Sequence, residues 1–129
     1  MRSDRVTLTV PARSEFAKTV RMTVAELASR IGMSYDEVDD VRMAAEEAFI
    51  YACNRSDGDD VTFSLDLLED GIAVTVGPVP VTDGAASEDE TQDRYAVFIL
   101  ESVCDEFEIS HTAEGSTLRL VRRMGGSCA

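Results

Sequence analysis

The sequence predicts an α+β fold: a two-layer α/β sandwich with a mostly antiparallel five-stranded sheet and three helices on one face. Two observations lead to this prediction. In three segments apolar residues recur at three- and four-residue steps, the period of a helix with one buried face. In five others apolar and polar residues alternate, as in strands that bury one face and leave the other in water. The segments follow the order β-α-α-β-β-loop-α-β-β.

The first strand and the first helix have clear ends. Residues 6–10 alternate Val, Thr and Leu, and Pro11 ends the strand because proline has no N–H to donate. A helix is predicted from roughly residue 14 to 30, with Gly32 as its natural stop. Its apolar residues lie on one face: Phe16, Val20, Val24, Leu27, Ala28 and Ile31.

A second helix is predicted from Asp36 to Asn54. Ser34, followed three residues later by Glu37, is a capping-box signature for its start. At about 100° per residue, Glu47 points roughly opposite the apolar stripe, towards a second and partly apolar face. A pocket on that side would explain this carboxylate, and so would a glutamate that is simply solvated. The stripe consists of Val38, Val41, Ala45, Ala48, Phe49 and Ala52.

The second half of the chain is predicted to be a hairpin, a long loop, a helix and two more strands. Asp70-Gly71 is the turn of the hairpin. The loop is inferred because its prolines, its glycine and an acidic run break every period. The remaining elements are the hairpin strands 61–67 and 72–76, the loop 77–92, a helix over 95–104, and strands around 107–111 and 118–120 joined by a turn at Glu114-Gly115.

Composition limits the possible functions. A chain of 129 residues that is 44% hydrophobic fits one domain, residues 1–129, with a core of its own. No apolar run approaches the roughly 20 residues that span a bilayer, so no membrane partner is expected. Three widely spaced cysteines make neither a disulfide framework nor a metal knuckle, which favours a reducing, cytoplasmic location.

The charge and the single histidine exclude further classes. His111 is the one histidine, so a metal site or catalytic triad built on histidines is not expected. We expect His111 to be an ordinary packed or surface residue. A formal charge of −13 argues against direct nucleic-acid binding, which needs clustered Lys and Arg. The same charge is compatible with a basic protein partner.

Four segments, in this order and spacing, resemble the bacterial anti-sigma factor serine kinases, which have the gyrase and histidine-kinase type of ATPase fold. They are LTVPARSEFAKTVRMTV, VDDVRMAAEEA, VFILESVCDEFEI and EGSTLRLVRR, and the resemblance runs from Leu8 to Arg123. It implies a homodimer whose partners are a sigma factor and an anti-anti-sigma protein. It also implies an ATP- and magnesium-dependent serine kinase activity.

The boxes that bind nucleotide in that family are matched only in part. The family's general base corresponds to Glu47, but Tyr51 stands where an asparagine holds magnesium. Pro78 stands where an aspartate reads adenine, and Arg94 opens a helix that has lost its phosphate-cradling glycines. The last element survives as 115–117, where Gly115 and Thr117 match, although a turn and a strand start explain it equally well.

The first helix matches the family better than the nucleotide-binding boxes do. Arg21 falls at a family position associated with partner contact, and Lys18 lies elsewhere on the exposed face of that helix. An ordinary solvated helix face is the alternative for both residues.

Three hypotheses follow. The favoured one is an anti-sigma factor-like regulator that acts by sequestration and partner switching, with no cofactor, no metal and no catalysis. The second is an active kinase that uses ATP and magnesium to phosphorylate an anti-anti-sigma protein, with Glu47 as the base. The third is an unrelated α/β ligand-binding domain that shares only the two-layer layout.

Overall fold

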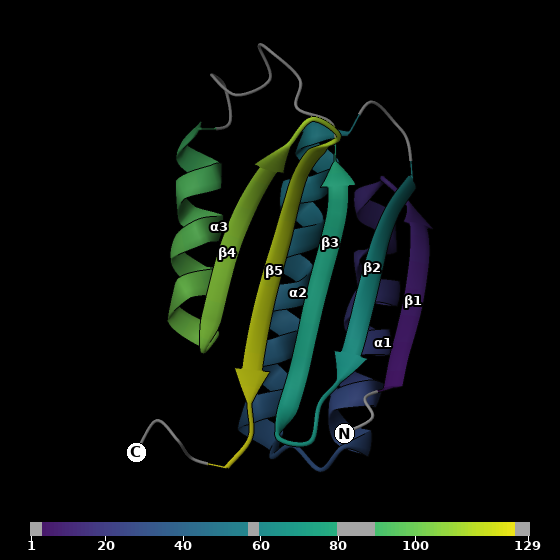
Figure 1. Ribbon diagram of the computed structural model, residues 1–129, viewed down its shortest axis with the longest axis vertical. Coiled ribbons are helices and arrows are strands. Elements are labelled where there is room, and N and C mark those ends of the chain that lie inside the picture. The colour runs from purple at the N-terminus through teal and green to yellow at the C-terminus, as the bar shows by residue number, and fades with distance from the viewer. Residues whose placement is uncertain (1–3, 57–59, 80–89, 126–129) are drawn as a thin grey trace.

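Three helices lie on one face of a five-stranded antiparallel sheet in this computed structural model, which confirms the predicted fold class (Figure 1). The structure describes residues 4–56, 60–79 and 90–125. The strands are β1 (Asp4–Pro11), β2 (Asp60–Leu67), β3 (Gly71–Val79), β4 (Glu106–Thr112) and β5 (Gly115–Arg123), in the spatial order β1-β2-β3-β5-β4. The helices are α1 (Ala17–Arg30), after a 3-10 turn (Ser14–Phe16), α2 (Tyr35–Arg55) and α3 (Glu90–Val103).

The core lies between the sheet and the helices. Seen from the open face of the sheet, α1 lies behind β1 and β2, α2 lies behind β3 and β5, and α3 stands beyond β4 at the sheet's edge (Figure 1). Alternate strand residues point to the helices, and their burial supplies most of the driving force for folding. The largest fully buried side chains include Phe49, Phe63, Leu65, Ile72, Leu100, Leu118 and Leu120. No helix in the described part of the chain is long and apolar enough to cross a membrane.

The predicted capping box at the start of α2 is confirmed. The backbone N–H of Ser34 donates to Glu37 Oε1 at 2.8 Å, and the N–H of Glu37 donates to Ser34 Oγ at 3.2 Å. The second oxygen of Glu37 accepts the N–H of Gly125 at 2.9 Å. These bonds lower the pKa of Glu37, the one from Ser34 most, because they favour the charged carboxylate. The helix start is thereby tied to the chain just after β5.

The predicted loop over 77–92 is too long at both ends. Strand β3 continues to Val79, which pairs with Ser116 after a shift in register, and α3 begins at Glu90, before the predicted Tyr95. Gly77 makes the continuation possible, because its φ is 115° and a Cβ there would lie 2.7 Å from the carbonyl oxygen of Ser116. The rest of the predicted loop, 80–89, lies outside the described residues.

The open face of the sheet is less uniformly wet than the alternation predicts. Ala73 and Val121 both point to that face, yet both are buried. They occupy one row across the sheet, between Asp66 of β2 and Glu106 of β4. Small and branched apolar residues in the middle of a charged row are shielded by the long side chains around them.

Candidate functional site

Helix α2 has a helical neighbour on each side, and each junction leaves a hollow. We call the hollow between α2, α3 and β4 the α2–α3 cavity, and the one between α1 and α2 the basic groove. Every site residue predicted on a helix lies at or beside one of these two. The Ala-rich centre of α2 is buried under the sheet, so the two flanks of the helix form walls of the α2–α3 cavity and of the basic groove.

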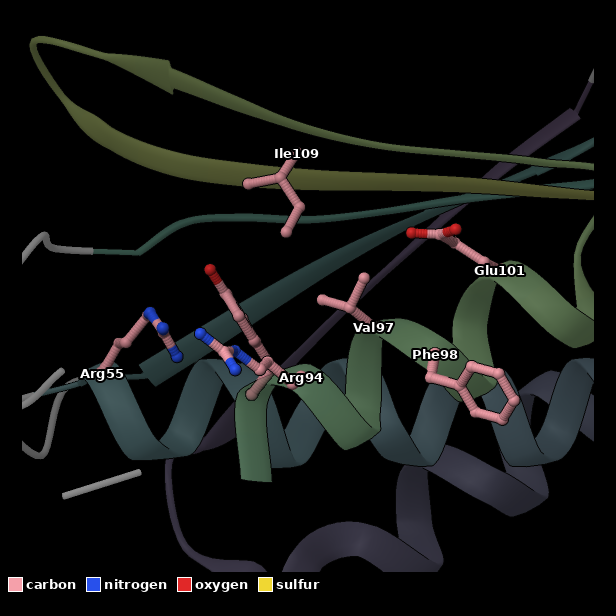
Figure 2. A pocket seen from close by; sticks show the side chains of 7 residues that line it. Arg55, Arg94, Val97, Phe98, Glu101 and Ile109 are labelled. Atoms are coloured by element: carbon pink, nitrogen blue, oxygen red, sulfur yellow. The ribbon is translucent and has the colours of Figure 1, made fainter. Parts of the chain in front are cut away.

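The α2–α3 cavity has a volume of about 460 Å³. Figure 2 shows Arg55 and Arg94 together at one end and Glu101 towards the other, with Val97 and Ile109 pointing into the space between. An apolar middle with charges of opposite sign at its ends suits a ligand of mixed polar and apolar character. Its lining residues are Tyr51, Arg55, Arg94, Val97, Phe98, Glu101 and Ile109.

Tyr51 fills the inner side of this cavity. Only 5% of the residue is exposed, so its ring occupies space on that side. The guanidinium of Arg55, one helical turn later, lies 3.7 Å from the centre of the ring, within range of a cation–π interaction. Although Glu47 lies one turn away on the same helix, the structure records no hydrogen bond between it and the Tyr51 hydroxyl.

Glu47 lies one turn before Tyr51 on α2 and is half-buried. Burial raises its pKa, and the neighbouring charge of Glu46 raises it further. Among the described residues, Glu47 has no ion pair or hydrogen bond, whereas Glu46 points to α1 and lies 3.6 Å from Arg21. Of the two adjacent glutamates, Glu47 is therefore the one that is available to accept a proton.

The side chains at the α2–α3 cavity do not fit a magnesium nucleotide. A neutral phenol is a poor magnesium ligand beside carboxylate, carbonyl and water oxygens, and the cation of Arg55 over its ring opposes a second cation. No cluster of three or more His, Cys, Asp or Glu side chains able to hold a metal ion occurs in the part of the chain that the structure describes.

The other three predicted pocket positions lie away from this cavity. Pro78 is exposed near the end of β3, and Gly115 and Thr117 flank the start of β5. None of the three lines the cavity that Tyr51 and Arg94 share. Ser116, which the sequence did not single out, is buried between them, and its Oγ lies 2.9 Å from Nδ1 of His111.

The basic groove brings Lys18 and Arg21 together with residues that the sequence analysis missed. Its volume is about 230 Å³, and it is lined by Lys18, Arg21, Met22, Ala25 and Arg42. Met22 is 61% exposed and is the large apolar side chain of this lining. In the sequence, Met22 stands out as an apolar residue among the cations on the polar face of the first helix, and this could have indicated the groove. Arg42 lies on a different helix, so no pattern in the sequence connects it with the groove. Glu46 and Asp39 partly neutralise Arg21 and Arg42, respectively.

Comparison with known proteins gives consistent results. The family described as histidine kinase-like ATPase domain matches residues 10–122. The serine-protein kinase RsbW of Halalkalibacterium halodurans is 35% identical over 75 residues, which are 57% of this chain and 46% of that relative. The chain thus spans less than half of that relative. The serine-protein kinase RsbW of Bacillus subtilis is 23% identical over 142 residues, which cover 96% of this chain and 88% of that relative.

A solved structure gives the same fold. The crystal structure of the RsbU and RsbW domains of a Mycobacterium tuberculosis protein superposes with a TM-score of 0.72 at 20% identity. The match covers 93% of this chain and 32% of that one. At this identity the likeness concerns the fold alone.

Proposed function

The chain belongs to the histidine kinase-like ATPase domain family, and on that premise we propose that it is an anti-sigma factor-like regulator that works by binding proteins and not by phosphoryl transfer. Its partners are a sigma factor, an anti-anti-sigma protein or both. It acts in the cytoplasm as a homodimer, with residues 1–129 forming one domain. One observation carries the absence of catalysis: Tyr51 is buried under Arg55 at the position of the magnesium-holding amide.

The chemistry at Tyr51 supports this proposal in two ways. An amide carbonyl can coordinate a cation without losing a proton, whereas a phenol becomes a good ligand for a cation only when its proton is lost. The ring also occupies volume that an asparagine would leave open. Pro78 adds a third obstacle, since it has neither a carboxylate for adenine nor a backbone N–H.

The basic groove supports the protein-binding half of the proposal. Lys18, Arg21 and Arg42 gather at one site on a chain whose net charge is −13. Long-range attraction therefore favours a partner that is basic overall, while the groove itself favours carboxylates on the segment that enters it. Met22 offers an adaptable apolar contact beside the cations. A partner with an acidic and apolar segment on a basic body satisfies both.

Calorimetry with ATP and magnesium on the purified chain tests the first half. We expect no dissociation constant below about 50 μM, equivalent to roughly −5.9 kcal/mol. Thermal unfolding with the same ligands should leave Tm unchanged, because a ligand that does not bind cannot stabilise. Tight binding would contradict the proposal. Restoring the amide with Tyr51→Asn shows whether Tyr51 alone blocks the site.

Co-purification tests the second half. The tagged chain, expressed in its native host, should retain a sigma factor or an anti-anti-sigma protein identified by mass spectrometry. If neither is retained under any growth condition, the assignment of the partners fails, whatever the calorimetry shows.

Glu47 favours a second candidate, the active serine kinase. A half-buried carboxylate whose pKa is raised by burial suits a general base. Incubation with labelled ATP, magnesium and the co-purified anti-anti-sigma protein decides between the two. Phosphoserine that disappears with Glu47→Gln would establish the kinase.

A further inference from the structure

Helix α3 extends past the sheet that it should cover. It packs chiefly on α2 and stands beyond β4 at the edge of the sheet (Figure 1). Its residues at positions i, i+3, i+4 and i+7, namely Arg94, Val97, Phe98 and Glu101, form one stripe along the α2–α3 cavity. Phe98 keeps 67% of its surface exposed, and Tyr95 on the same helix keeps 65%. Part of the surface of this helix, around Tyr95 and Phe98, therefore has no strand opposite it.

Strand β4 has an open edge beside that surface. Within the described residues β4 pairs with β5 alone, so its other side offers backbone N–H and C=O groups. Ile109 of β4 points to the helix layer and lines the same cavity. An edge strand next to a helix groove is the arrangement in which extended peptides bind by adding a strand.

The charges along the cavity set the pattern of such a segment. Arg94 and Glu101 are seven residues apart on α3, which corresponds to about 10.5 Å along the helix axis. Three alternate positions of an extended chain, all facing one way, span about 13 Å. Figure 2 shows the side chains that such a segment would meet. An acidic side chain of the segment would reach Arg55 and Arg94, an apolar one would cover Val97 and Ile109, and a basic one would reach Glu101.

We propose that an extended segment of a partner protein adds to the edge of β4 as a sixth strand, with acidic, apolar and basic side chains at alternate positions facing α3. This docking site is separate from the basic groove and does not depend on the regulator's proposed partners. The two can therefore succeed or fail independently.

Selection from a random decapeptide display library on the full chain tests the proposal. We expect enriched peptides with an acidic, an apolar and a basic residue at alternate positions. Fluorescence anisotropy of the synthetic peptides should show at least tenfold weaker binding to Arg94→Glu and to Glu101→Lys. The exposed ion pair on α1 supplies matched controls, since Arg30→Glu and Glu26→Lys make the same charge changes away from the cavity.

Two further measurements separate strand addition from simple charge attraction. Peptides N-methylated at the alternate amides that face β4 should lose binding, because they cannot complete the ladder with β4, whereas methylation of the other amides should not have this effect. Amide shifts in NMR titrations should concentrate on β4 and α3. Shifts confined to the basic groove, equal binding to all variants, or no enriched peptide would overturn the proposal. A dimer that Arg94→Glu dissociates, with no peptide enriched, would place a second copy of the chain at this edge and would also overturn it.

Discussion

The two ends of helix α2 use polar side chains in opposite ways. At the start, both oxygens of Glu37 accept backbone N–H groups, and Asp40 lies 3.1 Å from the guanidinium of Arg122 on β5. Arg122 also lies 3.4 Å from Asp105, so α2, β5 and the turn before β4 meet there. At the other end, Tyr51 and Arg55 face a cavity of about 460 Å³.

The difference separates stability from function on a single helix. Polar groups that are paired within the chain fix the geometry of the fold and have less left to offer a partner. Side chains that border an open hollow keep part of their binding capacity for something outside the chain. Mutations at the start of α2 should therefore change stability, and mutations at its flanks and end should also change binding.

The largest expected effect is that of Tyr51→Ala. Removing a buried ring should lower the free energy of unfolding by about 2–4 kcal/mol, in line with aromatic truncations in cores. Urea unfolding followed by circular dichroism measures it. Tyr35→Ala is the matched control, because Tyr35 opens the same helix but is 85% exposed, so its loss should matter little. A change below about 0.5 kcal/mol at Tyr51 would show that its ring does not support the core.

Glu37→Ala should come next. Loss of the capping box and of the acceptor for Gly125 N–H should lower the free energy of unfolding by about 1–2 kcal/mol. The pKa of Glu37 is lowered in the folded state, so its contribution is present above the unfolded pKa and is lost as the pH falls through the folded pKa. The difference from wild type should therefore shrink in acid. Asp36→Ala, in the same first turn, is the control, and an equal loss there would contradict the capping argument.

The sequence predicted the start of α2 better than its end. Ser34 and Glu37 are local in the chain, so a three-residue spacing was enough to predict their bonds. The α2–α3 cavity joins Tyr51, Arg94 and Ile109, which only the packing of three elements brings together. The same is true of Arg42 in the basic groove.

The ends of β3 and α3 could not be read locally either. In the sequence, Gly77 looks like a loop residue. Its structural role is to let the backbone of β3 approach Ser116 on β5, and nothing near it in the sequence indicates that contact. Periodicity reports the face that each segment buries. It says nothing of where two segments leave a gap.

Arg21→Glu tests the flank of α2 that faces α1. Placing a carboxylate in the basic groove should weaken capture of the co-purified partner about tenfold, equivalent to about 1.4 kcal/mol. Its 3.6 Å pair with Glu46 is partly exposed, so Tm should change little. Surface plasmon resonance and thermal unfolding measure the two quantities. Arg30→Glu makes the same change on α1 outside the groove, and equal binding by Arg21→Glu and wild type would remove Arg21 from the interface.

The smallest expected effect is that of Glu47→Gln, and its sign is informative. Burial raises the pKa of Glu47 in the folded state, so its contribution to stability is full below the unfolded pKa and is lost as the pH rises through the folded pKa. The neutral amide avoids that loss. The variant should be more stable than wild type at pH 7, by less than about 1 kcal/mol because the side chain is partly solvated, and equal to it in acid.

Thermal unfolding of wild type and Glu47→Gln across pH 3–8 measures this difference. A variant that is less stable at pH 7 would mean that the carboxylate makes a stabilising contact. A variant that is more stable would show that Glu47 is kept at a cost to the fold. Such a cost is expected of a residue retained for binding or chemistry.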